Sequence, residues 1–451
     1  MDFNEFKTSV LSYANEKGFE DCELYFSSGD SFGIMVLNQE VSSYEVSREQ
    51  GVGFRGLYNG NIGYSYSECV DQDAVNFLVD KAFENSQILI NETKEELFPG
   101  ESRYEDVNGF NRELHDISEN EIIEKALLME KSAKAFDEKI VAVEHCMISY
   151  GTEEIGINNT KSLNKDFKRN NITAYISVIA KDGECIKTGG EYYSGNKWCD
   201  FDYEKVAQNA AKAAVNHLNA KSIKSGKYKT LLKNEVMSDI LATFSGVFYG
   251  ENVEKGFSLL KGKKEGYVAS GIVTLRDDGL LIDGLSSYPF DSEGVACKNK
   301  VIIENGILKT YLHNIKSAKK MGEESTGNGF KASFKGSVQT SCTNFYIENG
   351  SISEEEILNQ IGNGVYITEV AGLHSGTNTI SGDFSLSAEG FMIEDGKVSY
   401  PIEQITIAGN FFELLLGIKS IGNDLRFGMA GGKGCFGSPM VYVNELSISG
   451  E

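Results

Sequence analysis

The chain has 451 residues, which suggests about three domains, and 41% of them are apolar, enough to build hydrophobic cores and to exclude a disordered chain or a small disulfide scaffold. Its 66 acidic and 43 basic side chains give a net charge of −23, which repels phosphate backbones, so we expect no direct contact with nucleic acid. No run reaches the ~18 to 20 apolar residues of a membrane span, and the first residues lack the basic start and apolar core of a signal peptide. We therefore expect a cytoplasmic protein without a membrane contact, whose eight cysteines are free thiols.

The first 90 residues predict a small unit of helix, strands and helix. An apolar stripe behind the possible N-cap Asp2 predicts an amphipathic helix over residues 3–14. Between residues 22 and 67, short apolar runs are broken by Ser-Ser-Gly-Asp at 27–30 and by Asn59-Gly60, a pattern typical of an antiparallel meander. A second helix is predicted over 71–85.

The same order of elements then recurs. Ser118 and Glu121 have the spacing of a capping box, which predicts the start of a helix that runs to Phe136. Four strands and a closing helix follow, with a turn at Asp182-Gly183: strands at 139–150, 153–158, 163–181 and 184–193, and a helix at 202–218. The repeat predicts two similar α/β units, 1–90 and 117–220, that share one sheet and are joined by a polar connection at 91–116.

A polar, lysine-rich stretch at 219–229 indicates the main boundary, and residues 226–451 are predicted to be a β-rich C-terminal domain. Asn305-Gly306 and Asp395-Gly396 each join two apolar runs and predict hairpins. Two helices are predicted late, one from the capping box at Ser353 to near Gly362 and one from Asn410 to about Ile421. The expected fold class is α+β, with a mixed α/β N-terminal part that repeats a helix, β-meander, helix unit.

The usual catalytic motifs are missing from the sequence. The five histidines are at least 30 positions apart, which excludes a helical zinc-protease motif and leaves open only sites assembled from distant segments. Neither a P-loop nor a nucleophile elbow occurs, and the glycine-rich run at 428–437 lacks the strand and helix context of a phosphate-binding loop.

One segment, residues 371–386, gathers His374, Asn378 and Asp383 among glycines. It has two interpretations: a stack of turns in which Asn378 and Asp383 cap their own backbone, or the wall of a peptide-binding cleft. Cys435 also allows two interpretations, a metal ligand or nucleophile on the one hand and a small core residue on the other.

Three blocks of sequence, at residues 277–295, 381–397 and 400–410, resemble the TldD/PmbA family, once called modulators of DNA gyrase, and specifically its PmbA (TldE) branch. The resemblance spans essentially the whole chain. It implies a mixed α/β N-terminal part followed by a β-rich C-terminal domain, which agrees with the elements predicted above.

The resemblance also implies where a metal site would lie. In the family, the TldD branch carries a His-Glu-x-x-x-His zinc motif and a late cysteine ligand. The matching positions here are Ala242, Thr243 and Val247, none of which can bind zinc or act as a base, and Cys435 lies about where the late cysteine would be. The resemblance therefore implies no cofactor in this chain and a zinc ion in its partner subunit.

The favoured hypothesis is a PmbA-like, non-catalytic subunit that pairs with a TldD-like zinc metalloprotease and helps to enclose peptides or unfolded proteins, with a homodimer possible when the partner is absent. His374, Asn378, Asp383 and Cys435 are its candidate cleft residues. One alternative is a binding or regulatory protein acting on gyrase or another target without proteolysis. The other is a self-sufficient peptidase with an unconventional site around His374 and Cys435.

Overall fold

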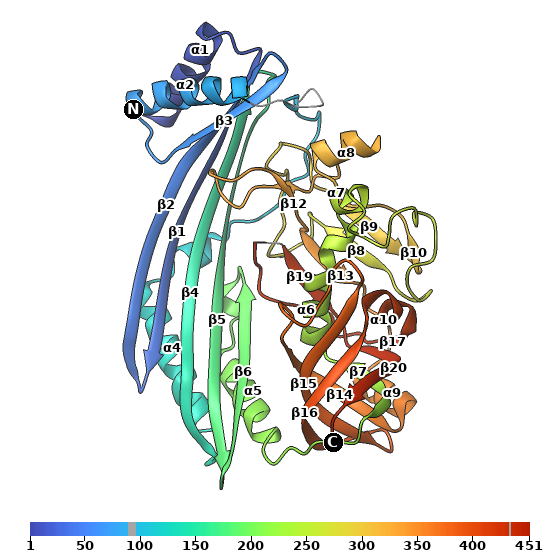
Figure 1. The fold of residues 1–451 in the computed structure, drawn as a ribbon. Helices are drawn as coiled ribbons and strands as arrows, with labels where there is room; N and C mark the ends of the chain where they lie inside the picture. The colour runs from blue at the N-terminus through green and yellow to red at the C-terminus, as the bar shows by residue number, and fades with distance from the viewer. Residues whose placement is uncertain (89–95, 433) are drawn as a thin grey trace.

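A long antiparallel sheet dominates the N-terminal half and contains the strands of both repeat units (Figure 1). In the computed structural model, which describes residues 1–88, 96–432 and 434–451, its strand order is β3-β2-β1-β4-β5-β6. The strands are β1 (Asp21–Leu37), β2 (Glu40–Tyr58), β3 (Asn61–Ser67), β4 (Ile140–Asn159), β5 (Asn164–Asp182) and β6 (Cys185–Gly195). Because β1 of the first unit pairs antiparallel with β4 of the second, the prediction that the two units share one sheet is confirmed.

The helices of this half begin where the capping residues predict. Asp2 accepts a hydrogen bond from the backbone N–H of Glu5, and Ser118 accepts one from that of Glu121. The helices are α1 (Phe3–Glu16), α2 (Gln72–Ile88), α3 (Arg112–His115), α4 (Glu119–Lys134) and α5 (Tyr203–Asn216), with a 3₁₀ turn η1 (Trp198–Asp200). Figure 1 shows α1 and α2 at one end of the sheet, and α4 and α5 along its other end.

Two predicted breaks in the strands are wrong. β1 continues through the Ser-Ser-Gly-Asp stretch, and the two strands predicted at 139–150 and 153–158 are one strand, β4. The physical reason is tertiary: Gly29 lies opposite Glu49 of β2 on one side and Glu153 of β4 on the other. With a ladder on both sides the backbone groups find partners, which outweighs a local preference for a turn.

Opposite faces of the long sheet pack against different parts of the chain. The helices bury two apolar clusters against one face, with Leu24 and Phe54 in one cluster and Ile148 and Ile176 in the other. The opposite face buries Phe167 against Phe290 of the C-terminal half. The predicted connection at 91–116 begins at residues outside the described ranges. Its described part reaches the C-terminal half, where the Tyr104 hydroxyl donates to the backbone oxygen of Gly294 at 2.7 Å.

The C-terminal half contains two six-stranded sheets and a short two-stranded one, in the orders β10-β9-β8-β13-β19-β18, β16-β15-β14-β7-β20-β17 and β11-β12. This β-rich half and the N-terminal α/β half confirm the predicted α+β fold class. The strands are β7 (Gly226–Leu232), β8 (Leu275–Asp278), β9 (Asn299–Glu304), β10 (Ile307–Leu308), β11 (Gly329–Phe330), β12 (Gln339–Thr340), β13 (Asn344–Ile347), β14 (Gly364–Ala371), β15 (Asp383–Glu394), β16 (Lys397–Asn410), β17 (Ile418–Ile421), β18 (Arg426–Phe427), β19 (Cys435–Ser438) and β20 (Val441–Ser449).

Local signals again predict the turns and most helix ends. Asn305-Gly306 and Asp395-Gly396 are hairpin turns in which all four residues have positive φ. The capping box at Ser353 is present, and the helix ends at Gly362. The helix predicted to run to Ile421 is too long, because it ends at Gly417 and residues 418–421 pair with β20. The helices are α6 (Asn234–Phe244), η2 (Ser245–Phe248), α7 (Gly250–Glu254), α8 (Ile315–Met321), α9 (Glu354–Ile361) and α10 (Phe411–Gly417).

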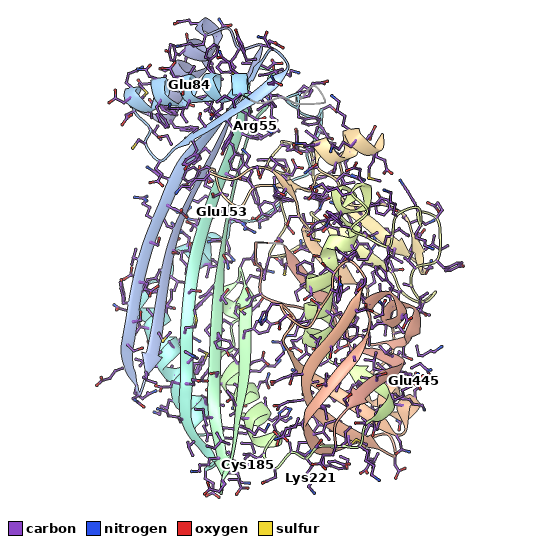
Figure 2. All side chains as sticks on the ribbon, in the orientation of Figure 1. Arg55, Glu84, Glu153, Cys185, Lys221 and Glu445 are labelled. Carbon is purple, nitrogen blue, oxygen red and sulfur yellow. The ribbon has the colours of Figure 1, made fainter. Side chains whose placement is uncertain are left out.

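Ion pairs join the edge strand β6 to the C-terminal half. The ammonium of Lys187 contacts the carboxylates of Glu389 and Glu403, and the guanidinium of Arg426 contacts Glu191 of β6 and Glu235 of α6. Figure 2 shows all side chains, with the labelled Cys185 and Lys221 at the end of the molecule where the chain passes from one half to the other. In the described ranges, no helix is both long enough and apolar enough to cross a bilayer.

Candidate functional site

Three adjoining cavities lie along the cleft between the long sheet and the C-terminal half; two have walls from both halves, and the third is lined by the C-terminal half alone. We call them the polar cavity, of about 270 Å³, the motif cavity, of about 520 Å³, and the strand cavity, of about 300 Å³. All three share Lys331 and Ala332, which follow β11. The labelled Glu153 in Figure 2 marks the level of the long strands at which the cleft lies.

The three positions that the resemblance matches to a zinc motif lie in the last turn of α6 and in the η2 turn that follows it. Ala242 and Thr243 are half-buried in its last turn, and Thr243 lines the motif cavity, with its hydroxyl donating to the backbone oxygen of Asp239 at 2.8 Å. Val247 lies in η2, where its side chain is only 1% exposed and packs in the main C-terminal core. These three side chains offer a methyl group, a hydroxyl and an isopropyl group, which do not fit a zinc ion.

The segment 371–386 connects β14 to β15 and behaves mainly as a stack of turns. The side-chain oxygen of Asn378 accepts from the backbone N–H of Ile380 and of Ser381, which is the capping arrangement expected of a turn. Its glycines allow close approach, since a Cβ at Gly376 would lie 2.2 Å from the backbone oxygen of Ser385. Thr379 and Ile380, and not the three predicted polar residues, line the motif cavity.

The other predicted side chains of this segment point elsewhere. His374 is exposed in the turn after β14. Asp383 is exposed and accepts from the hydroxyl of Ser381 at 2.7 Å and from the amide of Asn410 at 2.9 Å. These bonds lower the pKa of Asp383, Asn410 having the larger effect, so its carboxylate stays ionised as an acceptor.

Cys435 is the first residue of β19 and is fully buried. Its Sγ donates to the backbone oxygen of Gly428 at 3.3 Å, and burial raises the pKa of the thiol to about 12. A thiol with that pKa is not ionised near neutral pH, so it is neither a ready nucleophile nor a ready metal ligand. Its neighbour Gly434, not Cys435 itself, lines the polar cavity.

The predicted site residues do not meet in one cavity, but the segments that carry them do. Thr243, Ile380 and Gly432 meet on the walls of the motif cavity, so α6, the segment 371–386 and the glycine-rich loop share one site. Among the described residues, no group of three or more His, Cys, Asp or Glu side chains is arranged to hold a metal ion.

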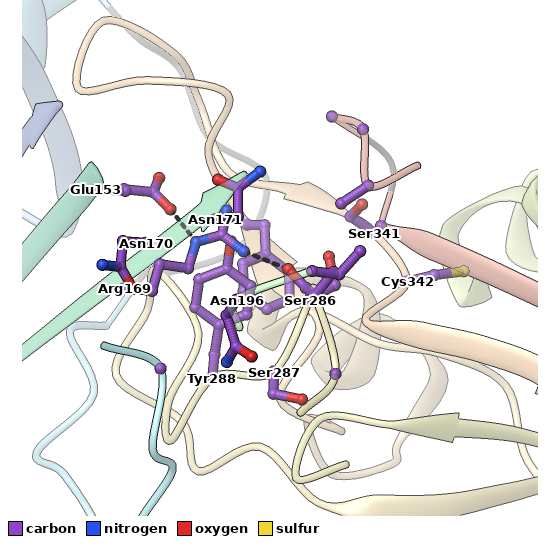
Figure 3. Close-up of a pocket in the computed structure, with 18 of the residues that line it drawn as sticks. Glu153, Arg169, Asn170, Asn171, Asn196, Ser286, Ser287, Tyr288, Ser341 and Cys342 are labelled. Atoms are coloured by element: carbon purple, nitrogen blue, oxygen red, sulfur yellow. Dashed lines mark hydrogen bonds and ion pairs between the residues drawn. The ribbon is translucent and has the colours of Figure 1, made fainter. Parts of the chain in front are cut away.

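The polar cavity is built around Arg169 on β5 (Figure 3). Arg169 lies directly opposite Glu153 in the β4–β5 ladder, and its Nε donates to that carboxylate. Its Nη1 donates to the backbone oxygen of Leu285 at 2.7 Å, and the guanidinium lies over the ring of Tyr288 at 4.5 Å from the centroid. Two contacts and a stacked ring thus fix the orientation of this cation at the cavity wall.

Lys331 is the second cationic residue of the cleft. Its Nζ lies 4.8 Å from the ring centroid of Tyr25 and 5.1 Å from that of Tyr64, and it has no hydrogen-bond partner within the described ranges. Burial lowers the pKa of Lys331 to about 7, an effect that the neighbouring Arg55 adds to. The amine is therefore close to its point of titration at neutral pH.

Sequence reasoning missed both Arg169 and Lys331. A usable signal existed for the first: Arg169 and Asn171 alternate along a predicted strand, so both lie on the same face as Phe167, where a two-sided strand would carry apolar residues. Lys331 follows a two-residue strand and carries no local signal.

Comparisons with known proteins agree with this architecture. Three family models match the chain: PmbA/TldA metallopeptidase domain 1 at residues 22–86, the central domain at 112–218 and the C-terminal domain at 225–450. The Metalloprotease PmbA homolog of Buchnera aphidicola (subsp. Acyrthosiphon pisum) is 31% identical over 73% of this chain and 70% of that protein. The Metalloprotease PmbA of Escherichia coli O157:H7 is 29% identical over 69% and 67%, respectively.

Solved structures show the same fold. A proposed modulator of a DNA gyrase from Thermotoga maritima superposes with a TM-score of 0.91 at 32% identity, covering 99% of this chain and 100% of that one. TldE from Thermococcus kodakarensis superposes with a TM-score of 0.90 at 23% identity, over 99% and 100%. Fold and matched sequence together define a protein of the metallopeptidase class. The chain belongs to the PmbA/TldD metallopeptidase family.

Proposed function

We propose that this chain is a non-catalytic, TldE-like subunit of a TldD-type metalloprotease complex that processes peptides and unfolded proteins. One observation carries the proposal. At the end of α6 and in η2, where the resemblance places His-Glu-x-x-x-His, the chain has Ala242, Thr243 and Val247, which supply neither a zinc ligand nor a general base.

The cleft supports a role in holding substrate. The motif cavity combines apolar walls from Tyr249, Phe257 and Ile380 with hydroxyls from Thr243 and Ser341, a surface that suits an extended peptide of varied sequence. In the complex, the zinc ion of the partner would supply the Lewis acid that activates water. This chain's residues would orient the peptide and exclude solvent. A zinc ion is proposed for the partner subunit only, and the complex is proposed to work in the cytoplasm.

The test compares the isolated chain with a mixture of this chain and the TldD-like protein of the same host. We expect no cleavage of unfolded casein by the isolated chain and cleavage by the mixture, which co-elutes as one complex in size-exclusion chromatography. Replacement of the partner's motif glutamate by glutamine should abolish cleavage without disrupting the complex. Cleavage by the isolated chain would refute the non-catalytic role.

The two other hypotheses give different results in the same test. A binding protein acting on gyrase, as the description of the Thermotoga maritima relative suggests for that protein, would capture gyrase without any protease. A self-sufficient peptidase would cleave casein alone and would lose activity with Cys435→Ser. The buried, protonated thiol of Cys435 argues against that mechanism.

A further inference from the structure

The polar cavity contains more hydrogen-bond donors than its own structure uses. Arg169 donates through Nε and Nη1, whereas Nη2 makes no hydrogen bond to any described residue. A guanidinium carries two N–H groups on that nitrogen. The cation is thus held firmly on one side and is open on the other.

Three other polar side chains that line the polar cavity also have free hydrogen-bond donors. Asn171 follows Arg169 by two positions on the same strand, so its amide lies on the same face of the sheet. The side chains of Asn171, Asn196 and Ser286 make no hydrogen bond to another described residue, although each lines the cavity. Figure 3 shows these side chains around the Arg169 guanidinium. Two amides, a hydroxyl and half of a guanidinium are an anion-binding set of donors.

The charge of the cavity wall also favours the binding of an anion. The chain carries a net charge of −23, yet among the described residues on the wall of this cavity Glu153 is the only acidic one and already pairs with Arg169, while Lys331 adds a second basic side chain. A small anion that enters therefore meets two basic side chains and one carboxylate in surroundings partly removed from solvent.

The position of the polar cavity beside the motif cavity indicates which kind of anion it would bind. The polar and motif cavities share Ser341, Lys331 and Gly432 on their walls, so they lie side by side. A peptide lying along the apolar motif cavity would place its end in the polar cavity. We propose that the polar cavity is a carboxylate-binding subsite, in which Arg169, Asn171 and Ser286 hold the carboxylate of a bound peptide. This inference rests on the proposed function and adds a substrate class to it.

The test measures binding to the full-length chain without the partner, so it is independent of proteolysis. The probe is an N-terminally fluorescein-labelled hexapeptide of small apolar residues, used with a free C-terminal carboxylate and with a C-terminal amide. By fluorescence polarisation, the free acid should bind at least about tenfold more tightly than the amide, because a charge-assisted hydrogen bond is lost in the amide. A third probe, an amide that ends in glutamate, distinguishes a side-chain carboxylate from a terminal one.

Three variants identify the residue that holds the carboxylate. Arg169→Gln should remove the preference for the acid. Arg276→Gln is the matched control, because that arginine is equally exposed, 27% against 28%, and pairs with Glu348 away from the cavity. Glu153→Gln should tighten binding of the acid by about threefold or more, since it frees the guanidinium from a competing carboxylate. A misfolded variant cannot give that gain.

Each result decides the proposal. Preference for the acid that disappears in Arg169→Gln, persists in Arg276→Gln and increases in Glu153→Gln would support it. Equal binding of acid and amide, no binding of any probe at millimolar protein, or a preference that survives Arg169→Gln would overturn it. Failure of the cleavage test in the complex, with these binding results intact, would overturn the proposed function alone.

Discussion

At the scale of single residues, burial alters the chemistry of two side chains near the cleft. It raises the pKa of the Cys435 thiol to about 12 and lowers the pKa of the Lys331 amine to about 7, because a low-dielectric environment penalises whichever form is charged. The first change makes a group that looks reactive in the sequence inert. The second makes an ordinary lysine sensitive to pH in the neutral range.

We expect Cys435 to resist alkylation in the folded protein. Iodoacetamide at pH 7.5 should modify the exposed Cys69 and Cys199, whereas Cys435 should react only after unfolding, because both the thiolate and access to it are missing in the folded state. Peptide mass spectrometry at successive times gives the rates. A reaction of Cys435 as fast as that of Cys199 would contradict its burial and revive the peptidase hypothesis.

Lys331 should make stability depend on pH above neutrality. Since its pKa is lower in the folded chain than in the unfolded chain, the unfolded chain binds the extra proton between pH 7 and about 10. The free energy of unfolding should therefore rise with pH there, by at most about 1.4 kcal/mol per unit from this group. Below pH 7 the full penalty of the buried charge remains.

Lys331→Met removes this titration. Its stability relative to the unmodified protein should be highest near pH 6 and should fall as the pH rises to 10, as measured by urea unfolding at each pH. Lys224→Met, a change at an exposed lysine, is the control and should give a constant difference. A pH-independent difference for Lys331→Met would mean that its amine is solvated.

At the scale of secondary-structure elements, local signals predict boundaries and tertiary pairing decides lengths. The hairpin turns and the cap at Ser353 are correct because a positive φ or a capping side chain is a property of a few neighbouring residues. The continuity of β1 across Gly29 and the end of α10 at Gly417 depend on partner strands that are distant in sequence. No local pattern contains that information.

The candidate site likewise combines features that the local sequence predicts with features that depend on distant residues. Thr243 and the glycine-rich loop come to the motif cavity from stretches that sequence reasoning had singled out. Arg169 donates a hydrogen bond to Leu285, which is 116 positions away in the sequence. The amine of Lys331 lies over the rings of Tyr25 and Tyr64. Such pairs could not be predicted without the fold, because only the packing of the sheet on the C-terminal half creates them.

The end of α6 allows a direct test of where the zinc-motif positions point. Val247→His should lower the free energy of unfolding by about 2–4 kcal/mol, because it places a polar ring in the core without a partner. Thr243→Glu should change it by less than about 1 kcal/mol, since that side chain lies at the cavity. Urea unfolding measures both. Equal effects would mean that both side chains face the same environment.

At the scale of the whole molecule, a few long-range contacts hold the long sheet against the C-terminal half. Arg426 follows its ion-pair partners Glu191 and Glu235 by 235 and 191 positions, and its guanidinium lies over the ring of Tyr192 at 4.7 Å from the centroid. This one side chain therefore joins β6, α6 and β18. Because the cleft lies between the two halves, its width depends on such contacts.

We expect Arg426→Ala to loosen the junction selectively. The change leaves Glu191, 11% exposed, without its cation and Glu235, 20% exposed, with Lys233 as its remaining cation, which should cost about 1–3 kcal/mol because Arg426 itself is 32% exposed and partly screened. Arg48→Ala is the control: its pair with Asp30 is largely exposed, and its loss should cost less than about 0.5 kcal/mol. Urea unfolding gives both values.

Hydrogen exchange followed by mass spectrometry then shows where the stability is lost. In Arg426→Ala, exchange should accelerate in β6 and α6 and stay unchanged in the hairpin of β1 and β2, because local opening follows the contacts that were removed. Binding of a cleft ligand should also weaken, since both walls of the cleft must be held in place for it. Uniform acceleration along the chain would instead mean that the two halves open together as one cooperative unit, and Arg426 would then stabilise the whole fold, not its junction.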